Sequence, residues 1–262
     1  LPLDQDRTRH LVLGDLDLDG DLDLVACRDG LDVRFYLNDG AGRFAPSAAG
    51  PAAAASTAAF GDVDGDGDPD LVLGVRGGQN RLFLNDGLGR FSDATAGRLP
   101  AAADPTNCLL LLDLDRDGDL DLFAGNELHQ NALYRNDGTG RFVDDTAASL
   151  PAAAWGTTCL AAGDVDGDGD PDLGLGTLPG EPGRLLLNDG TGRFSAAGPG
   201  ALPAAVDETR ALCLCDLDGD GDLDLLLGVF GGRILFLRND GTGLFAEATL
   251  GRMPVLTIRT RA

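Results

Sequence analysis

Short apolar runs alternate with polar turns along the whole chain, and the same succession of runs recurs five times. In each unit a first apolar run leads into an aspartate-rich segment, and a second run follows it. A variable connection leads to a third run, and the turn Asn-Asp-Gly separates this from a fourth run that contains phenylalanine. Runs this short, bounded by turn residues, are typical of strands rather than helices. Each unit therefore predicts four short antiparallel strands in about 50 residues.

Four-stranded units repeated at this period are typical of the blades of a β-propeller. We predict an all-β chain with five such blades, approximately over residues 1–48, 49–98, 99–149, 150–201 and 202–252. Residues 253–262 repeat the register of residues 1–10, either as the start of a further repeat or as a tail that closes the array. The pattern leaves open a closed five-bladed ring and a segment of a larger array.

The aspartate-rich segment joins the first two predicted strands of each unit and has aspartate at every odd position of nine residues. Carboxylates at positions 1, 3 and 5 of a tight loop direct three oxygens into one small volume. Glycine at position 6 permits the sharp turn, position 7 can offer its backbone carbonyl, and the aspartate at position 9 closes the shell. Oxygen ligands without cysteine or histidine nearby favour calcium over zinc or copper. We therefore predict Ca²⁺ as the cofactor, with about one ion per repeat.

The predicted metal residues are the aspartates of five loops, which begin 47 to 52 residues apart. They are Asp15, Asp17, Asp19, Asp21 and Asp23; Asp62, Asp64, Asp66, Asp68 and Asp70; Asp113, Asp115, Asp117, Asp119 and Asp121; Asp164, Asp166, Asp168, Asp170 and Asp172; and Asp216, Asp218, Asp220, Asp222 and Asp224. An EF-hand loop also carries ligands at positions 1, 3 and 5. It needs glutamate at position 12 and a flanking helix, whereas position 12 here is alanine or leucine within a short apolar run. The EF-hand is therefore excluded.

Two stretches of the sequence carry a resemblance to a known family. They are Gly-Asp-Val-Asp-Gly-Asp-Gly-Asp-Pro-Asp-Leu, at residues 61–71 and 163–173, and Leu-Phe-Leu-Asn-Asp-Gly-Leu-Gly-Arg-Phe, at residues 82–91. Together they resemble the FG-GAP/VCBS repeats of integrin-α-type propellers and of many bacterial extracellular proteins. The resemblance extends over essentially the whole chain. It implies the propeller fold, calcium in the loop between the first two strands, and a role in adhesion or ligand binding.

Charge and hydropathy narrow the range of partners and locations. The chain has 43 acidic and 20 basic residues and a net charge of −23, which excludes nucleic acid as a default partner. No apolar run approaches the roughly 20 residues of a membrane-spanning helix, so we predict no membrane span. Calcium modules with affinities of about 10⁻⁴ to 10⁻³ M are suited to the space outside cells. We therefore expect an extracellular or cell-surface location, with the periplasm as a further compartment.

The five cysteines cannot all pair within one chain. We interpret them as small buried hydrophobic residues with free thiols. A bridge between Cys27 and Cys215 is the alternative.

Candidate ligand-binding residues lie in the connections at the end opposite the aspartate loops. The most polar connection from a second to a third strand is residues 126–131, and the only tryptophan lies in the next connection from a fourth to a first strand. A tryptophan beside amides and a carboxylate can stack on a sugar ring while the polar groups bind its hydroxyls. The alternative is that the tryptophan packs over a blade edge and the histidine is merely exposed. The candidate residues are Asn126, Glu127, His129, Gln130, Trp155 and Arg76.

We predict a non-enzymatic, extracellular calcium-binding module for adhesion or ligand recognition. Its expected partner is a carbohydrate or a protein surface, and neighbouring copies of the chain are a further candidate. Two alternatives remain: a structural module of a surface fibre, and a domain of a polysaccharide-degrading enzyme. The sequence contains no serine nucleophile elbow and no phosphate loop. A polysaccharide lyase would need a base such as His129 in one cleft with groups such as Tyr134 and Arg135.

Overall fold

The computed structural model describes residues 7–28, 30–48, 50–203, 208–231 and 233–249. Within these residues the chain forms five four-stranded antiparallel sheets, one two-stranded sheet and two helical segments of four residues each. In four sheets the strand order follows the chain, and in the third the same order is read in reverse. The prediction of four-stranded, propeller-type blades is confirmed. The predicted role of residues 253–262 lies outside the described residues.

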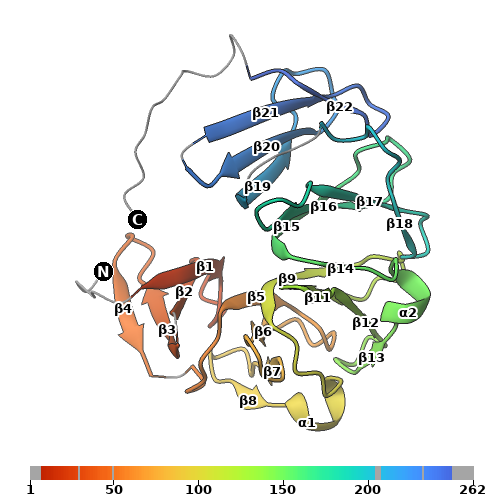
Figure 1. The fold of residues 1–262 in the computed structure, drawn as a ribbon. Coiled ribbons are helices and arrows are strands. Elements are labelled where there is room, and N and C mark those ends of the chain that lie inside the picture. The colour runs from red at the N-terminus through yellow and green to blue at the C-terminus, as the bar shows by residue number, and fades with distance from the viewer. Residues whose placement is uncertain (1–6, 29, 49, 204–207, 232, 250–262) are drawn as a thin grey trace. The chain divides into compact units, whose positions relative to one another are not determined.

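The strands follow the predicted order of runs (Figure 1). Blade 1 contains β1 (Thr8–Gly14), β2 (Asp23–Arg28), β3 (Leu31–Asn38) and β4 (Phe44–Ser47). Blade 2 contains β5 (Thr57–Gly61), β6 (Asp70–Gly74), β7 (Arg81–Leu84) and β8 (Ser92–Asp93), followed by α1 (Thr95–Arg98). Blade 3 contains β9 (Thr106–Leu112), β10 (Asp121–Asn126), β12 (Ala132–Asn136) and β13 (Phe142–Asp144), followed by α2 (Thr146–Ser149).

The last two blades repeat this plan, and one strand pair departs from it. Blade 4 contains β15 (Thr157–Gly163), β16 (Asp172–Thr177), β17 (Arg184–Asn188) and β18 (Phe194–Ala196). Blade 5 contains β19 (Thr209–Cys215), β20 (Asp224–Val229), β21 (Arg233–Asn239) and β22 (Phe245–Glu247). The additional strands β11 (His129–Gln130) and β14 (Ala154–Trp155) pair with each other outside the blades.

The chain divides into two compact units. Among the described residues, unit 1 comprises those up to residue 113 together with residues 117–124 and 132–146, and unit 2 comprises residues 114–116, 125–131 and those from residue 147 onward. Unit 1 therefore holds blades 1 and 2 and most of blade 3, whereas unit 2 holds blades 4 and 5 and the β11–β14 pair.

In unit 1, apolar cores lie between successive blades. Between blades 1 and 2, Val25 and Phe35 pack with Leu71 and Phe83. The phenylalanine of the fourth run, Phe91, joins this core with its ring centroid 5.7 Å from that of Phe35. The other face of blade 2 packs on blade 3 in the same way, through residues such as Val72, Leu82, Tyr134 and Phe142. Blade 2 is thus covered on both faces, which explains why β6 is buried along its whole length and carries three consecutive apolar residues.

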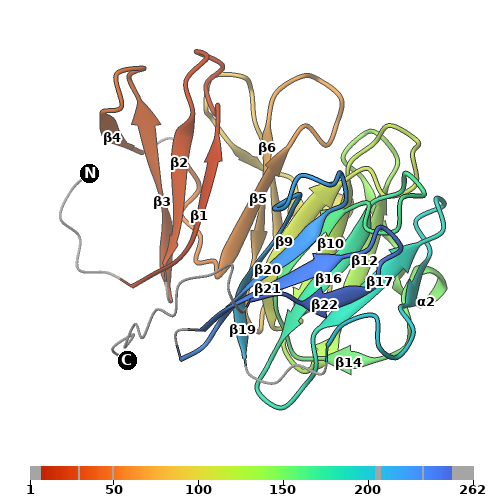
Figure 2. The ribbon, with the colours of Figure 1, turned by 90° about the horizontal axis from the view of Figure 1, so that it is seen from above.

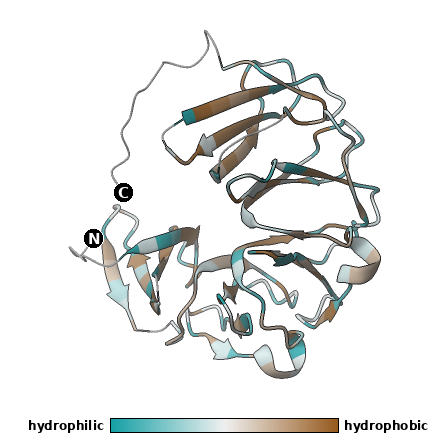
Figure 3. Cartoon of the chain, viewed as in Figure 1, coloured by the Kyte–Doolittle hydropathy of each residue, from teal (hydrophilic) through white to brown (hydrophobic). Residues whose placement is uncertain are grey.

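Unit 2 contains the same kind of core between blades 4 and 5. Val165 and Leu185 of blade 4 pack with Leu225, Leu237 and Phe245 of blade 5. Figure 3 shows the hydrophobic residues concentrated in the strands. Figure 2 shows the strands of blade 1 side by side, with the connecting loops at their two ends. The loops are therefore sorted into two sets, one at each end of a blade.

All five cysteines are free, so the alternative of a bridge between Cys27 and Cys215 is wrong for this structure. Cys27 is buried, and burial raises the pKa of its thiol to about 12. Cys213 is exposed, which corrects the expectation that every cysteine is buried.

Candidate metal and ligand sites

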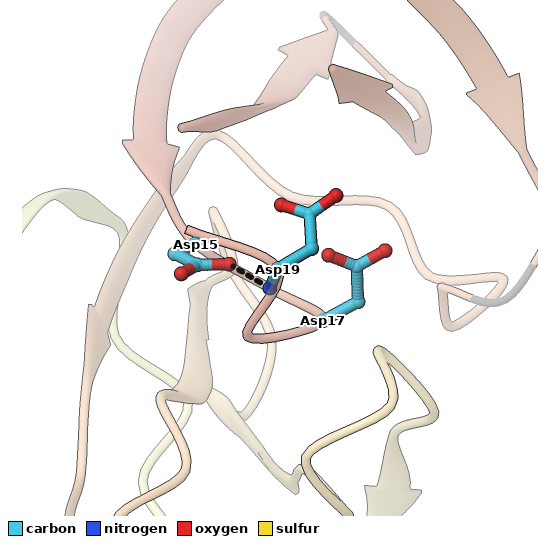
Figure 4. Close-up of side chains that lie close together, drawn as sticks. All are labelled: Asp15, Asp17 and Asp19. Atoms are coloured by element: carbon cyan, nitrogen blue, oxygen red, sulfur yellow. Dashed lines mark hydrogen bonds between the residues drawn. The ribbon is translucent and has the colours of Figure 1, made fainter. Parts of the chain in front are cut away.

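Each aspartate loop brings three carboxylates together between the first and second strands of its blade. Numbered by blade, loops 1 to 5 cover residues 15–23, 62–70, 113–121, 164–172 and 216–224. One oxygen from each of three aspartates lies within 4.8 Å of the other two in every loop. The clusters are Asp15, Asp17 and Asp19; Asp62, Asp64 and Asp66; Asp113, Asp115 and Asp117; Asp164, Asp166 and Asp172; and Asp216, Asp218 and Asp224. Figure 4 shows the cluster of loop 1 around its turn.

Backbone N–H groups hold the carboxylates at positions 1 and 5 in place. The Oδ2 atom of position 1 accepts the N–H of the glycine at position 6 in all five loops, at 2.9 to 3.1 Å. These glycines have φ between +90° and +98°, which other residues rarely adopt. The Oδ1 atom of position 5 accepts the N–H of position 7, again at 2.9 to 3.1 Å. The sequence therefore folds into a turn whose backbone N–H groups fix two of the predicted ligand side chains.

The carboxylate at position 3 provides the test of whether a cation fits. In Asp17, Asp64 and Asp166 the Oδ1 atom is buried and has no hydrogen-bond partner within the described part of the chain. Burial raises the pKa of all three carboxyls, and the charges of neighbouring aspartates raise it further. A buried carboxylate oxygen without a partner is costly, and a cation among these oxygens removes that cost. The residues present therefore fit a hard divalent cation such as Ca²⁺.

Position 9 has a second function that the sequence did not indicate. This aspartate is the first residue of the second strand and is fully buried in every blade. Its Oδ1 atom accepts the backbone N–H of the asparagine in the Asn-Asp-Gly turn, at 2.8 to 3.0 Å. In loops 1, 2, 4 and 5 its Oδ2 atom accepts the N–H of position 2, at 2.9 to 3.0 Å. Position 9 thus joins the loop to the turn, and burial raises the pKa of Asp70 and of Asp172 to about 6.

The side chain at position 7 packs against the glycine of the Asn-Asp-Gly turn. A Cβ atom at that glycine would lie 2.5 to 2.8 Å from the carboxylate of position 7 in all five blades. The glycines also have φ between +71° and +80°, as the tight turn requires. The predicted role of the position-7 backbone carbonyl as a ligand stays a prediction.

The asparagine of the turn also links neighbouring blades. In unit 1, Nδ2 of Asn85 donates to the carbonyl of Leu16 at 2.9 Å, and Nδ2 of Asn136 donates to that of Val63 at 2.8 Å. In unit 2 the same bond runs from Asn188 to Leu114 at 2.9 Å and from Asn239 to Val165 at 2.7 Å. Each acceptor is position 2 of the preceding aspartate loop. The sequence predicted a hairpin turn here, and the recurrence of asparagine in all five repeats was the signal for this additional bond.

Arginines that the sequence analysis did not single out contact three of the loops. In unit 1, Nη1 of Arg98 lies 3.3 Å from Oδ2 of Asp64 and donates to the carbonyl of Thr139 at 2.6 Å. In unit 2, Arg116 contacts Asp170 of loop 4 at 2.5 Å, and Arg238 contacts Asp218 and Asp220 of loop 5. These arginines are distant in sequence from the carboxylates they contact or lie in another blade, so spacing alone did not reveal them.

The structure brings together two of the predicted ligand-binding residues. His129 and Trp155 face each other in the β11–β14 pair, and Gln130 faces Ala154. The guanidinium of Arg184 lies 5.6 Å from the centroid of the tryptophan ring, within the distance of a cation–π contact. His129 is exposed, and Trp155 is half-buried. The sequence analysis missed Arg184, whose position became evident only from the fold.

The other predicted ligand-binding residues have different surroundings. Asn126 is fully buried, and its side chain donates to the carbonyl of Gln130 at 2.9 Å. It therefore shapes the connection and does not present its amide to solvent, which corrects its prediction as a ligand contact. Glu127 is partly exposed beside Leu128, which has a positive φ of 58°. Arg76 lies in unit 1, where it forms an isolated bridge with Pro105.

The groups named for a lyase cleft are engaged elsewhere. Tyr134 is buried in unit 1, and burial raises its pKa to about 12. Arg135 contacts Asp121 at 2.5 Å and Asp145 at 3.4 Å.

The fold and the loops together define a class of protein: a repeat chain of propeller-type blades, each with an aspartate loop between its first two strands. The FG-GAP-like repeat matches residues 15–73, 62–124, 113–175 and 177–227, and the chain belongs to this family. The resemblance found in the sequence is thereby confirmed. No curated protein matches the chain.

Solved structures with the same fold have low sequence identity to the chain. A lectin of Agrocybe aegerita, described as recognising non-reducing terminal N-acetylglucosamine, is 20% identical with a TM-score of 0.58, over 92% of this chain and 66% of the lectin. BBS1N in complex with ARL6DN is 12% identical with a TM-score of 0.52, over 90% of this chain and 80% of that one. The V. cholerae biofilm matrix protein Bap1 is 16% identical with a TM-score of 0.51, over 92% of this chain and 39% of that one. The chain thus spans less than two thirds of the lectin and of Bap1, and these likenesses support the fold alone.

Across the described residues, no helix has the length and apolar character needed to cross a membrane.

Proposed function

We propose that the chain is an extracellular recognition module whose blades are rigidified by calcium, with one ion in each aspartate loop. The observation that carries this proposal is the recurrence of three carboxylates within 4.8 Å in all five loops. The buried Oδ1 atom without a partner at position 3 of loops 1, 2 and 4 supports it. Without bound cations, the repulsion among the carboxylates of the five clusters would destabilise the folded chain.

The donor set favours calcium over other cations. All the donors are oxygens, which hard cations prefer, and Ca²⁺ accepts six to eight of them in irregular geometry. Mg²⁺ demands a near-octahedral site and gives up its waters reluctantly. The side chains at positions 1, 3, 5 and 9 would hold the ion, with the carbonyl of position 7 as a further ligand. Positions 1, 3 and 5 already cluster in loops 1 to 3, and positions 1, 3 and 9 cluster in loops 4 and 5.

The chain's own residues transmit the effect of the ion to the rest of the blade. Position 9 fastens the loop to the Asn-Asp-Gly turn, and the asparagine of that turn donates to the loop of the preceding blade. A loop stabilised by an ion therefore stabilises its own hairpin and the contact with its neighbour. Ligands that bind only the folded state add to its stability by mass action.

The test counts bound ions in the parent and in Asp17→Asn, which alters the position-3 ligand of loop 1. Equilibrium dialysis followed by metal analysis should give five calcium ions for the parent and four for the variant. Asp144→Asn is the control, because it removes the same charge from an exposed carboxylate outside the loops. Fewer than three ions in the parent would contradict the proposal.

A second candidate function is carbohydrate recognition at the β11–β14 pair. The observation that favours it is the pairing of His129 with Trp155, with Arg184 against the indole. In blades 1, 2, 4 and 5, as far as the structure describes them, the corresponding connections carry no such strand pair. Asn131 is buried beside this pair, and its Nδ2 atom has no hydrogen-bond partner among the residues that the structure describes. An aromatic ring with polar groups around it is the usual composition of a sugar-binding site, and a lectin shares the fold.

A glycan array that includes N-acetylglucosamine, followed by titration of the best ligand, tests this candidate. Trp155→Ala with His129→Ala should reduce affinity at least about tenfold, equivalent to 1.4 kcal/mol. Phe230→Ala is the matched control, since Arg210 lies 5.2 Å above the Phe230 ring in a comparable arginine–aromatic pair of blade 5. Equal losses in both variants, or no loss in the double variant, would place recognition elsewhere. Binding of a protein surface in place of a glycan would overturn the choice of ligand.

A further inference from the structure

The residue that precedes the Asn-Asp-Gly turn divides the blades into two groups. It is leucine in blades 1, 2 and 4, and arginine in blades 3 and 5. The leucines pack against the cores between blades; they are Leu37, Leu84 and Leu187. The arginines, Arg135 and Arg238, contact carboxylates instead.

Arg238 contacts two of the predicted calcium ligands of loop 5. Its Nε lies 2.7 Å from Oδ2 of Asp218 at position 3, and its Nη2 donates to Oδ2 of Asp220 at position 5 at 2.7 Å. Arg135 differs, because it contacts position 9 of its own loop and Asp145 outside the loop. A single guanidinium therefore bridges the position-3 and position-5 carboxylates of loop 5.

A guanidinium and a calcium ion satisfy the same need in such a loop. Each places positive charge among carboxylates that otherwise repel one another. Ca²⁺ binds its oxygens at roughly 2.3 to 2.6 Å, so an ion held by these two carboxylates would lie close to the guanidinium. At so short a distance the guanidinium and the ion repel each other, and a carboxylate that is already paired with one cation attracts the second less strongly. The two cations therefore compete for Asp218 and Asp220.

We propose that Arg238 is a built-in counter-cation of loop 5, which neutralises the loop when calcium is scarce and swings out when calcium binds. The inference rests on the proposed function, since it presupposes calcium in the loops. The Arg238 side chain is 47% exposed, so solvent can receive it when it leaves. Loop 5 then binds calcium more weakly than a loop in which no arginine bridges positions 3 and 5. Loop 1 is the reference, because Leu37 stands where loop 5 has the arginine.

The experiment compares the full chain with Arg238→Leu, which gives blade 5 the residue of blades 1, 2 and 4. The control is Arg90→Leu, which removes the same charge from an exposed arginine 3.9 Å from Asp86, outside the aspartate loops. Calcium chloride is titrated calorimetrically into each metal-free protein, and thermal unfolding is followed in chelator and in calcium. Asp216→Asn, which changes a loop-5 ligand, identifies the calorimetric class that belongs to loop 5.

The parent should show one class of weak binding that is missing in Asp216→Asn. Arg238→Leu should tighten this class about tenfold, a change of 1.4 kcal/mol, and leave the other classes unchanged. The same variant should lower the melting temperature in chelator but not in calcium, whereas Arg90→Leu should have the same small effect in both. Arg238→Gln, which keeps donors without the charge, is expected to change in the same direction and replaces the leucine variant if that does not fold.

An unchanged or weakened loop-5 class in Arg238→Leu, with the full number of ions still bound, would overturn the role of Arg238 and leave the calcium proposal intact. If neither the parent nor any variant binds calcium, both proposals fail together.

Discussion

The two ends of each blade follow different rules. At the aspartate-loop end, the same hydrogen bonds recur in every blade: position 1 to the glycine at position 6, position 5 to position 7, and position 9 to the turn. At the opposite end the connections differ in length and composition, and one of them forms the additional β11–β14 pair. Bonds between blades exist at that end too, such as Nδ2 of Asn80 to Oγ1 of Thr106 at 3.0 Å, but the detail varies.

The difference shows where each end obtains its stability. A loop that gathers carboxylates needs fixed N–H donors and, on our proposal, a cation, so almost every position is constrained. A connection at the opposite end has to span two strands and pair its buried backbone groups, which many sequences achieve. Recognition can therefore differ at one end while the other end preserves the blade. Four predictions test this contrast.

Removal of calcium should have the largest effect, because it acts on all five loops at once. Binding at 100 times the dissociation constant contributes about 2.7 kcal/mol per site. For a chain of this size each kcal/mol shifts the melting temperature by roughly 2 to 4 °C. Calorimetry in excess chelator should therefore show a fall of about 10 °C or more, which readdition of calcium reverses. A melting temperature that does not change in chelator would contradict this prediction and the contrast between the two ends of each blade.

Loss of a link between blades at the loop end should come next. Asn188→Ala removes the bonds from Nδ2 to the carbonyls of Leu114 and Pro171 and leaves both acceptors without this donor. We expect a loss of about 2 to 3 kcal/mol in the free energy of unfolding, measured by urea denaturation. Asn38→Ala is the control, since Nδ2 of Asn38 donates to the carbonyl of Leu22 within its own blade, and it should cost about 1 kcal/mol. Equal costs would mean that the link between blades contributes nothing of its own.

Glycine substitutions compare the two ends within blade 4. Gly190 has φ +77°, and a Cβ atom there would lie 2.5 Å from Oδ2 of Asp170. Gly180, at the opposite end, has φ +84° and nothing within 4 Å. Both alanine variants incur the strain of a positive φ, about 1 kcal/mol. Only in Gly190→Ala does the new Cβ atom also overlap the carboxylate of Asp170. Gly190→Ala should therefore be the less stable of the two by a further 1 kcal/mol or so, and its calcium affinity should fall because position 7 moves.

Trp155→Ala should have the smallest effect on stability. The indole is half-buried in a two-residue strand pair outside the blades, so its loss should cost less than about 1 kcal/mol and leave calcium stoichiometry unchanged. The melting temperature and the ion count of the purified variant provide the check. A large drop in melting temperature would show that this connection is part of the framework after all.

The local elements could be predicted because their causes are local. In residues 62–70, the glycine at position 6 predicts the turn, and the aspartates at every second position predict the metal ligands. The apolar residues that follow this loop predict a buried strand. Asn85 and Gly87 likewise indicate a tight turn. For His129 and Trp155 the sequence predicted only that they lie at the same end of the array, not that they pair. Asn126 was wrongly predicted as a ligand contact, because the polarity of a side chain does not show whether it is buried.

Local sequence is therefore sufficient for the repeat, the four strands of each blade, and the carboxylates gathered in each loop. These follow from turn geometry and from the spacing of residues only a few positions apart. Contacts between polar groups that are far apart along the chain became evident only in the folded structure. The fold brought Asn85 to the carbonyl of Leu16, Arg184 to the ring of Trp155, and Arg238 to Asp218. Such contacts depend on the packing of whole sheets and on the rotamers of long side chains. The packing energy that determines them is spread over many apolar residues and is not encoded in any one motif.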